Sequence, residues 1–411
     1  MNDLIEVRSE ILQRINRLPA ERLPLPRAIG RTVAEDILSG DSIPPFDNTA
    51  MDGFALRHRD SASASPEHNI TLNVTAIVEA GTAELPQLNA GEAARIYTGA
   101  PIPPGADCVI PFEHTESYDD ATVQLSQPVP DGHSIRRAGD DLRRGDVAVA
   151  AGTRLNPAGI GLLATVGCSE VPVVRRPRVA VHSSGNELIP VTEPLTPGKI
   201  RNSNLYSICA RLERWGADVL PRPVLIDTPE AVRKGLLETL EQKPDAIVTT
   251  GGVSAGDLDY IRDVARELGS DVQVRRVNMK PGKPLVDGTI GGVPFFGLPG
   301  NPAACLVSFE VFVRPALAQM EGRDDGALPR RAARVMTQQP IRGAGRLQFL
   351  RARVTFDDNA GEYQLQPMAG QGSHLLSSFA DANCLVEVSA EQKQLEAGAT
   401  VAVWLLDQGT A

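Results

Sequence analysis

The chain has 411 residues, of which 42% are hydrophobic and 22% charged, a composition that supports a large core and two to three domains at roughly 150 residues each. A formal net charge of −10 argues against a nucleic-acid partner, because binding one requires many phosphates to be neutralised. No apolar run approaches the roughly 18 residues of a membrane span, and the acidic start lacks a signal peptide's basic and apolar regions, so we expect a cytoplasmic protein without a membrane partner.

The cysteines are scattered along the chain and contain no CxxC pair. This spacing favours buried, reduced thiols over a disulfide framework or a zinc site. The residues concerned are Cys108, Cys168, Cys209, Cys305 and Cys384.

The N-terminal part of the chain changes character near residue 40. Residues 3–38 are expected to be helical at first and then loosely amphipathic, with a break at 27–31. From 41 to 134 the pattern becomes β-rich, because 70–74 and 123–125 alternate as half-buried strands do.

Residues 176–321 alternate between strand and helix patterns. The expected strands are 179–181, 219–226, 245–250, 272–277 and 293–298. The expected helices are 203–215, capped by Asn202 or Ser203 and stopped by Gly216, one that opens at Thr228-Pro229-Glu230, 259–268 and 302–319. This alternation predicts a doubly wound, mostly parallel α/β sheet with ligands at the carboxyl ends of its strands. Beyond about residue 331 strand patterns return without helices, which predicts a small β domain, a barrel.

Three short glycine- and proline-rich segments in the second half carry the strongest functional signal. The first, 249–260, follows the apolar strand 246–248, and its paired glycines expose backbone N–H groups where the next helix begins, a geometry that binds anions. The second, 280–284, brings two lysines to a turn whose prolines restrict its movement, and the third is 298–302. Together they predict a site for a phosphorylated or otherwise anionic small molecule.

Asp257 and Asp259 adjoin the first of these segments and are candidate ligands for magnesium. Mg²⁺ is typically held by one or two carboxylates together with substrate phosphates and water. A second interpretation stays open, because a helix N-terminus accepts acidic residues through its dipole alone.

The N-terminal half carries weaker signals. Segment 44–55 concentrates acids, an amide and a hydroxyl, which suits either a functional site or a surface turn with local side-chain hydrogen bonds. Segment 95–101 is typical of a strand that ends in a turn presenting the Thr98 hydroxyl, and 136–141 mixes arginines with aspartates as exposed ion pairs do. No serine–histidine–acid triad is evident, and His182 is as consistent with a hydrogen-bonded structural residue as with a catalyst.

Taken together, these segments closely resemble the molybdopterin molybdenumtransferases, the MoeA family that includes the gephyrin E domain. The resemblance covers nearly the whole chain. It rests on 47–53, 97–101, 136–141, 184–188, 251–260, 279–284, 298–302 and, in the β tail, 372–374.

The resemblance implies a reaction of three components: adenylylated molybdopterin, molybdate and Mg²⁺. The phosphoanhydride is cleaved, molybdenum enters the dithiolene, and AMP is released with the finished cofactor. Since the sulfur ligands belong to the substrate, such a protein requires no cysteine pair. Both reactants are anions, which suits local cationic groups inside an acidic chain.

The family's functional residues can be carried over onto matching positions. Catalytic roles fall on Asp52, Asp141, Glu187, Asp227 and Asp259, and metal binding on Asp259, Asp257 and Glu187. Substrate binding falls on Thr98, Gly251, Gly252, Ser254, Arg276, Lys280, Lys283, Pro299, Asn301 and Ser373. Arg276 replaces a lysine found in some members, which keeps the charge but alters the geometry. Asn186 replaces an aspartate of some members, which weakens any assignment of residue 186 to metal binding.

The family's architecture implies four parts and a dimer. Residues 1–39 and 137–174 would form an elongated linking and dimerisation region, with 40–136 as a β-rich inserted lobe, 175–321 as the α/β molybdopterin-binding domain and 322–411 as the C-terminal β domain. In the homodimer, a site would lie between the α/β domain of one subunit and the lobe of the other. The adenylyltransferase that acts one step earlier and the recipient molybdoenzymes are the further partners implied.

Two rival functions stay open at this point. One is the molybdopterin adenylyltransferase, whose single domain is similar to residues 175–321 alone, so that the lobe and the β tail count against it. The other is a non-enzymatic scaffold, because gephyrin-like proteins also cluster partners through this module.

Overall fold

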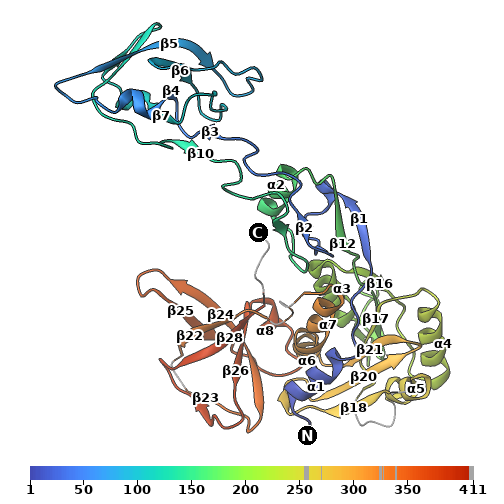
Figure 1. Ribbon diagram of the computed structural model, residues 1–411. Helices are drawn as coiled ribbons and strands as arrows, with labels where there is room; N and C mark the ends of the chain where they lie inside the picture. The colour runs from blue at the N-terminus through green and yellow to red at the C-terminus, as the bar shows by residue number, and fades with distance from the viewer. Residues whose placement is uncertain (254–258, 270, 324–325, 327, 338–339, 407–411) are drawn as a thin grey trace. The chain divides into compact units, whose positions relative to one another are not determined.

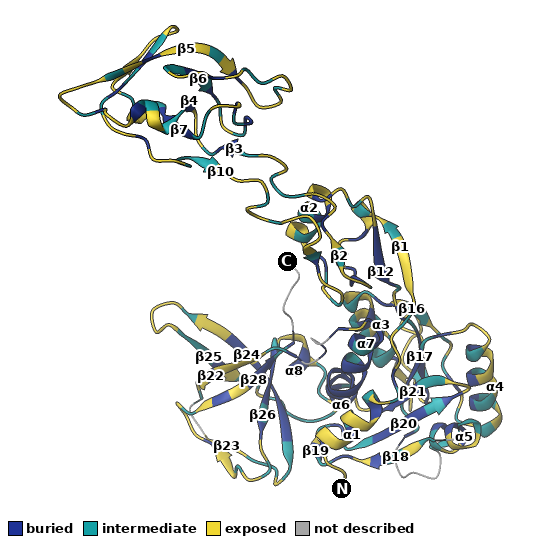
Figure 2. Cartoon of the chain, in the orientation of Figure 1, coloured by how far each residue is buried: buried dark blue, intermediate teal, exposed yellow. Residues whose placement is uncertain are grey.

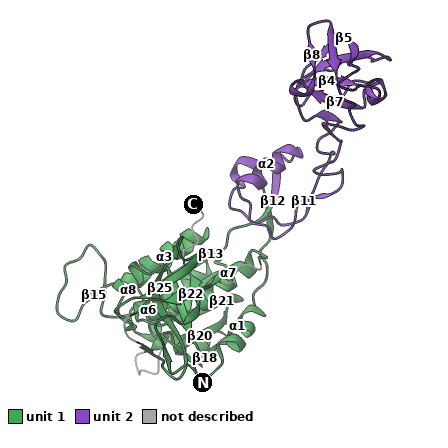
Figure 3. Cartoon of the chain, turned by 90° about the vertical axis from the view of Figure 1, so that its left-hand side faces the viewer, with its two compact units in different colours: residues 1–21, 173–411 green, residues 22–172 purple. Residues whose placement is uncertain are grey.

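The computed structural model describes residues 1–253, 259–269, 271–323, 326, 328–337 and 340–406. The chain divides into two compact units, residues 1–21 with 173–411 (unit 1) and residues 22–172 (unit 2) (Figure 3). Two of the predicted site residues, Ser254 and Asp257, lie outside the described residues. The finer four-part division stays a prediction.

Unit 2 is rich in short strands. They are β1 (Ala20–Pro24), β2 (Ile37–Leu38), β3 (Asn48–Thr49), β4 (Gly53–Leu56), β5 (Ile70–Val78), β6 (Glu92–Ile96), β7 (Cys108–Pro111), β8 (Ser117–Tyr118), β9 (Thr122–Leu125), β10 (Ile135–Arg136), β11 (Val147–Val149) and β12 (Glu170–Val174). The helical segments are η1 (Leu25–Arg27), η2 (His58–Ser61), η3 (Phe112–His114) and α2 (Pro157–Thr165).

Unit 2 contains a six-stranded sheet in the order β7-β4-β6-β5-β9-β8 (Figure 1). Both of its faces are covered, since Phe54 and Ile110 point into one apolar cluster while Ala55 and Val109 point into another. This alternation is what successive side chains on a strand produce, and the expectation of a β-rich lobe is confirmed. The helical start expected for 3–38 is present as far as Leu12, and the loosely amphipathic stretch after it contains β1, η1 and β2.

Unit 1 contains an α/β part. Its strands are β13 (Arg178–Ser183), β14 (Leu188–Ile189), β15 (Ile200–Arg201), β16 (Asp218–Pro221), β17 (Ala246–Thr250), β18 (Gln273–Arg276), β19 (Met279–Lys280), β20 (Pro284–Ile290) and β21 (Val293–Leu298). Its helices are α1 (Leu4–Leu12), α3 (Ser203–Trp215), α4 (Pro229–Leu240), α5 (Tyr260–Leu268), α6 (Pro302–Ser308), the π-helical turn η4 (Phe309–Val313) and α7 (Arg314–Met320).

The α/β sheet has the order β16-β13-β17-β21-β20-β18. Its first four strands run parallel, as expected, whereas β20 is antiparallel to both β21 and β18. Sequence patterns missed β20, because it follows directly on the lysine–proline turn and joins β21 through a short hairpin. The strand expected at 219–226 ends at Pro221, where prolines 221 and 223 provide no backbone donor.

Helices cover both faces of this sheet, which makes it doubly wound. Val179 and Val181 pack in the cluster that includes α3 and α6, and Ala180 packs in the cluster of α4 and α5 on the other face. The predicted caps are present, since Asn202 accepts a hydrogen bond from the backbone N–H of Leu205 (3.2 Å) at the start of α3.

The helical run Pro302–Met320 is long and apolar enough to cross a membrane by length and composition alone. However, 89% of the apolar 18-residue stretch within this run is buried in unit 1, and Figure 2 shows α6 as one of the most deeply buried helices. It is a core helix packed on the α/β sheet.

The C-terminal part of unit 1 is a closed barrel, as expected. Its elements are β22 (Arg330–Val335), β23 (Ile341–Arg342), β24 (Leu347–Asp357), β25 (Glu362–Pro367), α8 (Ser377–Ala380), β26 (Cys384–Val388), β27 (Gln394–Leu395) and β28 (Thr400–Leu405). The sheet order β19-β24-β25-β22-β28-β26 closes through a further β24–β26 pairing. Because β19 also pairs with β24, the barrel is tied directly to the turn that carries Lys280.

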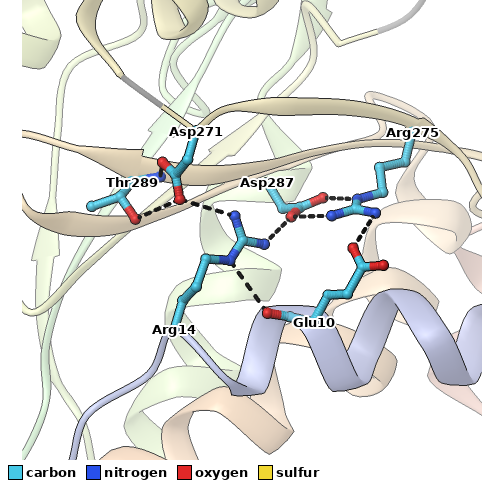
Figure 4. Close-up of polar contacts among 6 residues, drawn as sticks. All are labelled: Glu10, Arg14, Asp271, Arg275, Asp287 and Thr289. Carbon is cyan, nitrogen blue, oxygen red and sulfur yellow. Dashed lines mark hydrogen bonds and ion pairs between the residues drawn. The ribbon is translucent and has the colours of Figure 1, made fainter.

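A network of charged side chains fastens the N-terminal segment to the edge of the α/β sheet (Figure 4). Asp287 on β20 is 1% exposed and accepts hydrogen bonds from Arg275 (2.7 and 3.2 Å) and from Arg14. Arg275 also pairs with Glu10 of α1 (2.6 Å), and Arg14 with Asp271 (3.2 Å). One buried carboxylate therefore joins two strands to the N-terminus.

We expect Asp287→Asn to lower the free energy of unfolding of unit 1 by about 3 kcal/mol, because two guanidinium groups would then face a neutral amide in a buried site. Urea unfolding monitored by circular dichroism measures this loss. The matched control is Glu267→Gln, which removes an ion pair with Arg233 whose side chains are 52% and 43% exposed and should cost less than about 1 kcal/mol. Equal losses in the two variants would contradict the role given to Asp287.

His182 lies on β13, is 1% exposed, and does not line the cavity described below. Its Nε2 lies 2.8 Å from Thr239 Oγ1 and its Nδ1 3.2 Å from the carbonyl oxygen of Pro223. Burial lowers the pKa of His182 from 6.5 to about 4. These contacts favour the structural interpretation of this histidine.

Stability should therefore fall in mild acid. Between the folded pKa of about 4 and the unfolded pKa of 6.5, the unfolded chain binds the proton and the folded chain does not. Above pH 6.5 His182 is neutral in both states and does not lower the free energy of unfolding. By about pH 5 its protonation in the unfolded chain lowers that free energy by about 2 kcal/mol. His182→Gln should remove this part of the pH dependence in urea unfolding. A control substitution of the exposed His68 should leave it unchanged.

Candidate active site

A cavity of about 1070 Å³ lies in unit 1 at the carboxyl ends of β13, β17 and β21. It is completed by the turn after β19 and by residues of the barrel part. Ten of the predicted site residues line it: Glu187, Asp227, Gly251, Gly252, Asp259, Lys280, Lys283, Pro299, Asn301 and Ser373. The topology thus brings together segments that are nearly two hundred residues apart in the sequence.

The two glycines after β17 are required by the backbone. Gly251 and Gly252 have φ values of +89° and +65°. A Cβ at Gly251 would lie 2.5 Å from the carbonyl oxygen of Ser184, and one at Gly252 would lie 2.8 Å from Ile261 Cγ1. Any other residue would push the ends of β13 and β17 apart or strain the turn. The floor of the cavity is therefore built from closely packed backbone.

Asp227 holds the loop that follows β13. Its Oδ1 accepts a hydrogen bond from the Ser184 hydroxyl, and its Oδ2 accepts one from the backbone N–H of Asn186 (3.0 Å). The Asn186 side chain in turn accepts from the backbone N–H of Asp227 (3.1 Å). Both residues are engaged in shaping the loop, in keeping with the earlier argument against residue 186 as a metal ligand.

Two further acids line the cavity, Glu187 and Asp259. Asp259 occupies the N-cap position of α5, but its side chain makes no capping hydrogen bond, so capping does not explain the residue. Carboxylate oxygens fit Mg²⁺, which typically uses one or two of them with water and substrate phosphates. In the part of the chain that the structure describes, the carboxylates of the cavity do not come close enough together to form a three-ligand metal site.

Cationic groups approach from several segments. Lys280 is exposed and Lys283 half-buried, on a turn that pairs with the barrel through β19. Arg201 and Arg346 also line the cavity, and sequence reasoning missed both. Arg346 precedes β24 in a glycine-rich loop that carried no recognisable motif, and only the closing of the barrel against β19 brings it here. The cavity can therefore attract anions inside an acidic protein.

A second group of predicted residues lies in unit 2. Asp52 Oδ1 accepts hydrogen bonds from the backbone N–H and the hydroxyl of Thr98, both 2.7 Å, and these lower the pKa of Asp52 below its usual value. Asp47 accepts from Arg137 (2.7 Å), and β3 pairs with β10. The segments 47–53, 97–101 and 136–141 are thus neighbours in space.

Two further predicted residues neither line the cavity nor contact the Asp52–Thr98 pair. Asp141 is exposed in unit 2, where its backbone N–H donates to the carbonyl of Ile43 (2.9 Å). Arg276 is exposed at the end of β18, and its backbone bonds to Asn2 rather than facing the cavity.

Comparison with known families and structures covers the whole chain. Residues 3–167 match the MoeA N-terminal region (domain I and II), 180–319 match a probable molybdopterin binding domain, and 334–406 match the MoeA C-terminal region (domain IV). The solved structure of a molybdopterin biosynthesis MoeA protein from Pyrococcus horikoshii is 33% identical, covers 100% of both chains and superposes with a TM-score of 0.83.

Curated relatives extend over nearly the full length as well. The molybdopterin molybdenumtransferase of Haemophilus influenzae is 34% identical over 404 residues and 98% of each chain. Molybdopterin molybdenumtransferase 2 of Mycobacterium tuberculosis is 37% identical over 387 residues, 93% of this chain and 94% of the relative. With such identity over nearly its whole length, the chain belongs to the MoeA family of molybdopterin molybdenumtransferases, transferases of molybdenum cofactor biosynthesis.

Proposed function

We propose that this enzyme inserts molybdenum from molybdate into adenylylated molybdopterin and releases AMP in a Mg²⁺-dependent reaction. The observation that carries the proposal is the cavity of unit 1, which is lined by lysines, arginines, a backbone glycine turn and the carboxylates of Glu187, Asp227 and Asp259. This combination suits a substrate with a phosphoanhydride and an oxyanion co-substrate.

Each group has a part in this reaction. Lys280 and Lys283 bind the phosphates and molybdate, because charge-assisted hydrogen bonds to anions are the strongest kind. The turn at 251–252 and the loop at 299–301 hold the substrate against the strand ends, with Ser373 on the barrel side. Asp259 and Glu187 would hold Mg²⁺, which when bound neutralises charge on the phosphoanhydride. Water cleaves that bond and frees AMP, and the two dithiolene thiols displace one oxygen of molybdate as water, so that molybdenum is bound without a change of oxidation state.

We further propose that the enzyme is a cytoplasmic homodimer with a shared site. The α/β domain (175–321) and the barrel domain (322–411) of one subunit would meet the lobe (40–136) of the other, with 1–39 and 137–174 as the linking region. In support, unit 2 holds its own ordered pair, Asp52 and Thr98, within segments that resemble those of the family. Asp141, Arg276, Ser254 and Asp257 keep the roles that the resemblance implies as part of this proposal.

An adenylyltransferase supplies the substrate in this scheme, and molybdoenzymes receive the product. The rival in which this chain is itself the adenylyltransferase is not favoured, because the relatives match well beyond residues 175–321. A purely structural scaffold would make no use of the carboxylates and lysines in the cavity.

AMP release distinguishes the three candidate functions. Purified enzyme with adenylylated molybdopterin, molybdate and Mg²⁺ should release AMP, which chromatography measures. A scaffold would release none, and an adenylyltransferase would consume ATP instead. Lys280→Gln and Lys283→Gln should each raise the KM for substrate roughly tenfold to a hundredfold, since each loses a charge-assisted bond of about 1.5–3 kcal/mol. Lys234→Gln, at a side chain 77% exposed on α4, is the matched control and should behave as wild type.

Mixed dimers test the shared site. Asp259→Ala should abolish Mg²⁺-dependent turnover without unfolding the chain, because a half-buried cavity carboxylate is lost and no core volume changes. Asp52→Ala should also be inactive. In a heterodimer of the two variants, one shared site carries both substitutions and the other carries neither. Such heterodimers should therefore regain up to about half of the activity of a wild-type dimer. Heterodimers that form but stay inactive, or a fully active monomer in sedimentation, would rule out the shared site.

A further inference from the structure

Among the described residues that line the cavity of unit 1 there is no Phe, Tyr or Trp on which a flat substrate could stack. The aromatic or guanidinium side chains in this lining are those of His374, Arg201 and Arg346. Adenylylated molybdopterin carries two planar heterocycles, the aminopyrimidinone ring of the pterin and the adenine. Proteins commonly bind such rings by stacking them on aromatic or guanidinium groups. The cavity therefore offers few partners for two heterocycles, and a larger aromatic surface lies elsewhere in the molecule.

Unit 2 carries an aromatic cluster, which we define as Phe54, Tyr97, Phe112 and Tyr118 around Arg95. The Phe112 and Tyr118 rings are stacked, with centroids 5.2 Å apart and an interplanar angle of 26°. Phe54 meets both edge-on at 5.3 Å. The stacked pair thus packs against the fully buried ring of Phe54.

Arg95 sits among these rings instead of in a close ion pair. Its Cζ lies 5.1 Å from the centroid of Phe112 and 5.8 Å from those of Tyr97 and Tyr118. The Arg95 Nη1 lies 3.8 Å from Oδ1 of the fully exposed Asp120, and the buried Nε has no hydrogen-bond partner in the described part of the chain. Cation–π attraction thus holds the Arg95 guanidinium against the three rings.

One side of the aromatic cluster is open. Tyr118, at the end of the stack, is 44% exposed. Ile77, the strand neighbour of Arg95 in the β5–β6 register, is 61% exposed. A third planar ring can extend the Phe112–Tyr118 stack on this side.

The Asp52 carboxylate borders the aromatic cluster. The backbone N–H of Phe112 donates to the backbone carbonyl of Asp52 (3.2 Å), and Tyr97 directly precedes Thr98, which holds Asp52 Oδ1. Asp52 Oδ2 accepts no hydrogen bond from any residue that the structure describes. A carboxylate complements the two adjacent N–H donors of an aminopyrimidinone, whereas the adenine edge pairs its donor with an acceptor. The hydrogen-bonding pattern of Asp52 therefore favours the pterin over adenine.

We propose that unit 2 is the pterin-recognition site of the enzyme, with the pterin ring stacked on Tyr118 and its amino edge on Asp52. This inference rests on the proposed function, because unit 2 of one subunit has to face the cavity of the other. It divides the substrate between two surfaces: unit 1 takes the phosphates, molybdate and metal, and unit 2 takes the ring.

The test uses the full-length protein with Tyr118→Ala, Tyr118→Phe and the control Phe356→Ala, which removes another surface ring, 50% exposed and paired edge-on with Tyr363. Tyr118→Ala should raise the KM for adenylylated molybdopterin about tenfold with kcat nearly unchanged, because stacking contributes to binding rather than to bond cleavage. Tyr118→Phe and Phe356→Ala should resemble wild type. Thermal unfolding confirms that each variant is folded.

Binding of two probes separates the outcomes. The same Tyr118→Ala change should weaken binding of 6-hydroxymethylpterin, followed by its fluorescence, and leave binding of AMP unchanged. Loss of AMP binding instead would assign the stack to adenine and overturn the proposal. Unchanged KM and unchanged probe binding would also overturn it, while AMP release by the wild type would leave the proposed function standing. If wild-type AMP release failed, pterin binding would still decide the role of the aromatic cluster.

Discussion

The close approach of backbone at the carboxyl ends of three parallel strands is the constraint on which unit 1 depends. β13, β17 and β21 end side by side, and Gly251 lies so near the Ser184 carbonyl that a Cβ would come within 2.5 Å of it. Gly300 lies against the same point, where an added Cβ would be 3.5 Å from Gly251 Cα. Only because these turns pack so tightly can the loops beyond them open a single cavity.

Charged side chains serve different purposes in different parts of this protein. The acidic chain gathers Arg201, Arg346 and the two lysines of the 280–284 turn at the cavity, from three segments far apart in the sequence. Elsewhere a buried carboxylate such as Asp287 is matched by two arginines, which keeps the N-terminal helix on the edge of the sheet. Paired charges hold the fold, and the cations gathered at the cavity attract anions.

In the proposed reaction the two units would divide the chemistry between them. Unit 1 provides cations, carboxylates and backbone donors but no Phe, Tyr or Trp among the described lining of its cavity. Unit 2 provides Asp52, Thr98 and an arginine packed among aromatic rings. A substrate with a phosphoanhydride at one end and a planar ring at the other fits such a division.

The sequence by itself determined the local structure of the α/β part and the identity of most cavity segments. Helix α3 begins and ends where Asn202 and Gly216 predict, since caps are decided by neighbouring residues. The glycine and lysine–proline turns were equally visible, because their backbone demands are local. Tertiary structure alone decided the antiparallel direction of β20 and the presence of Arg346 in the cavity. Pairing direction and the closing of a barrel depend on contacts between segments far apart in the chain, which local patterns do not record.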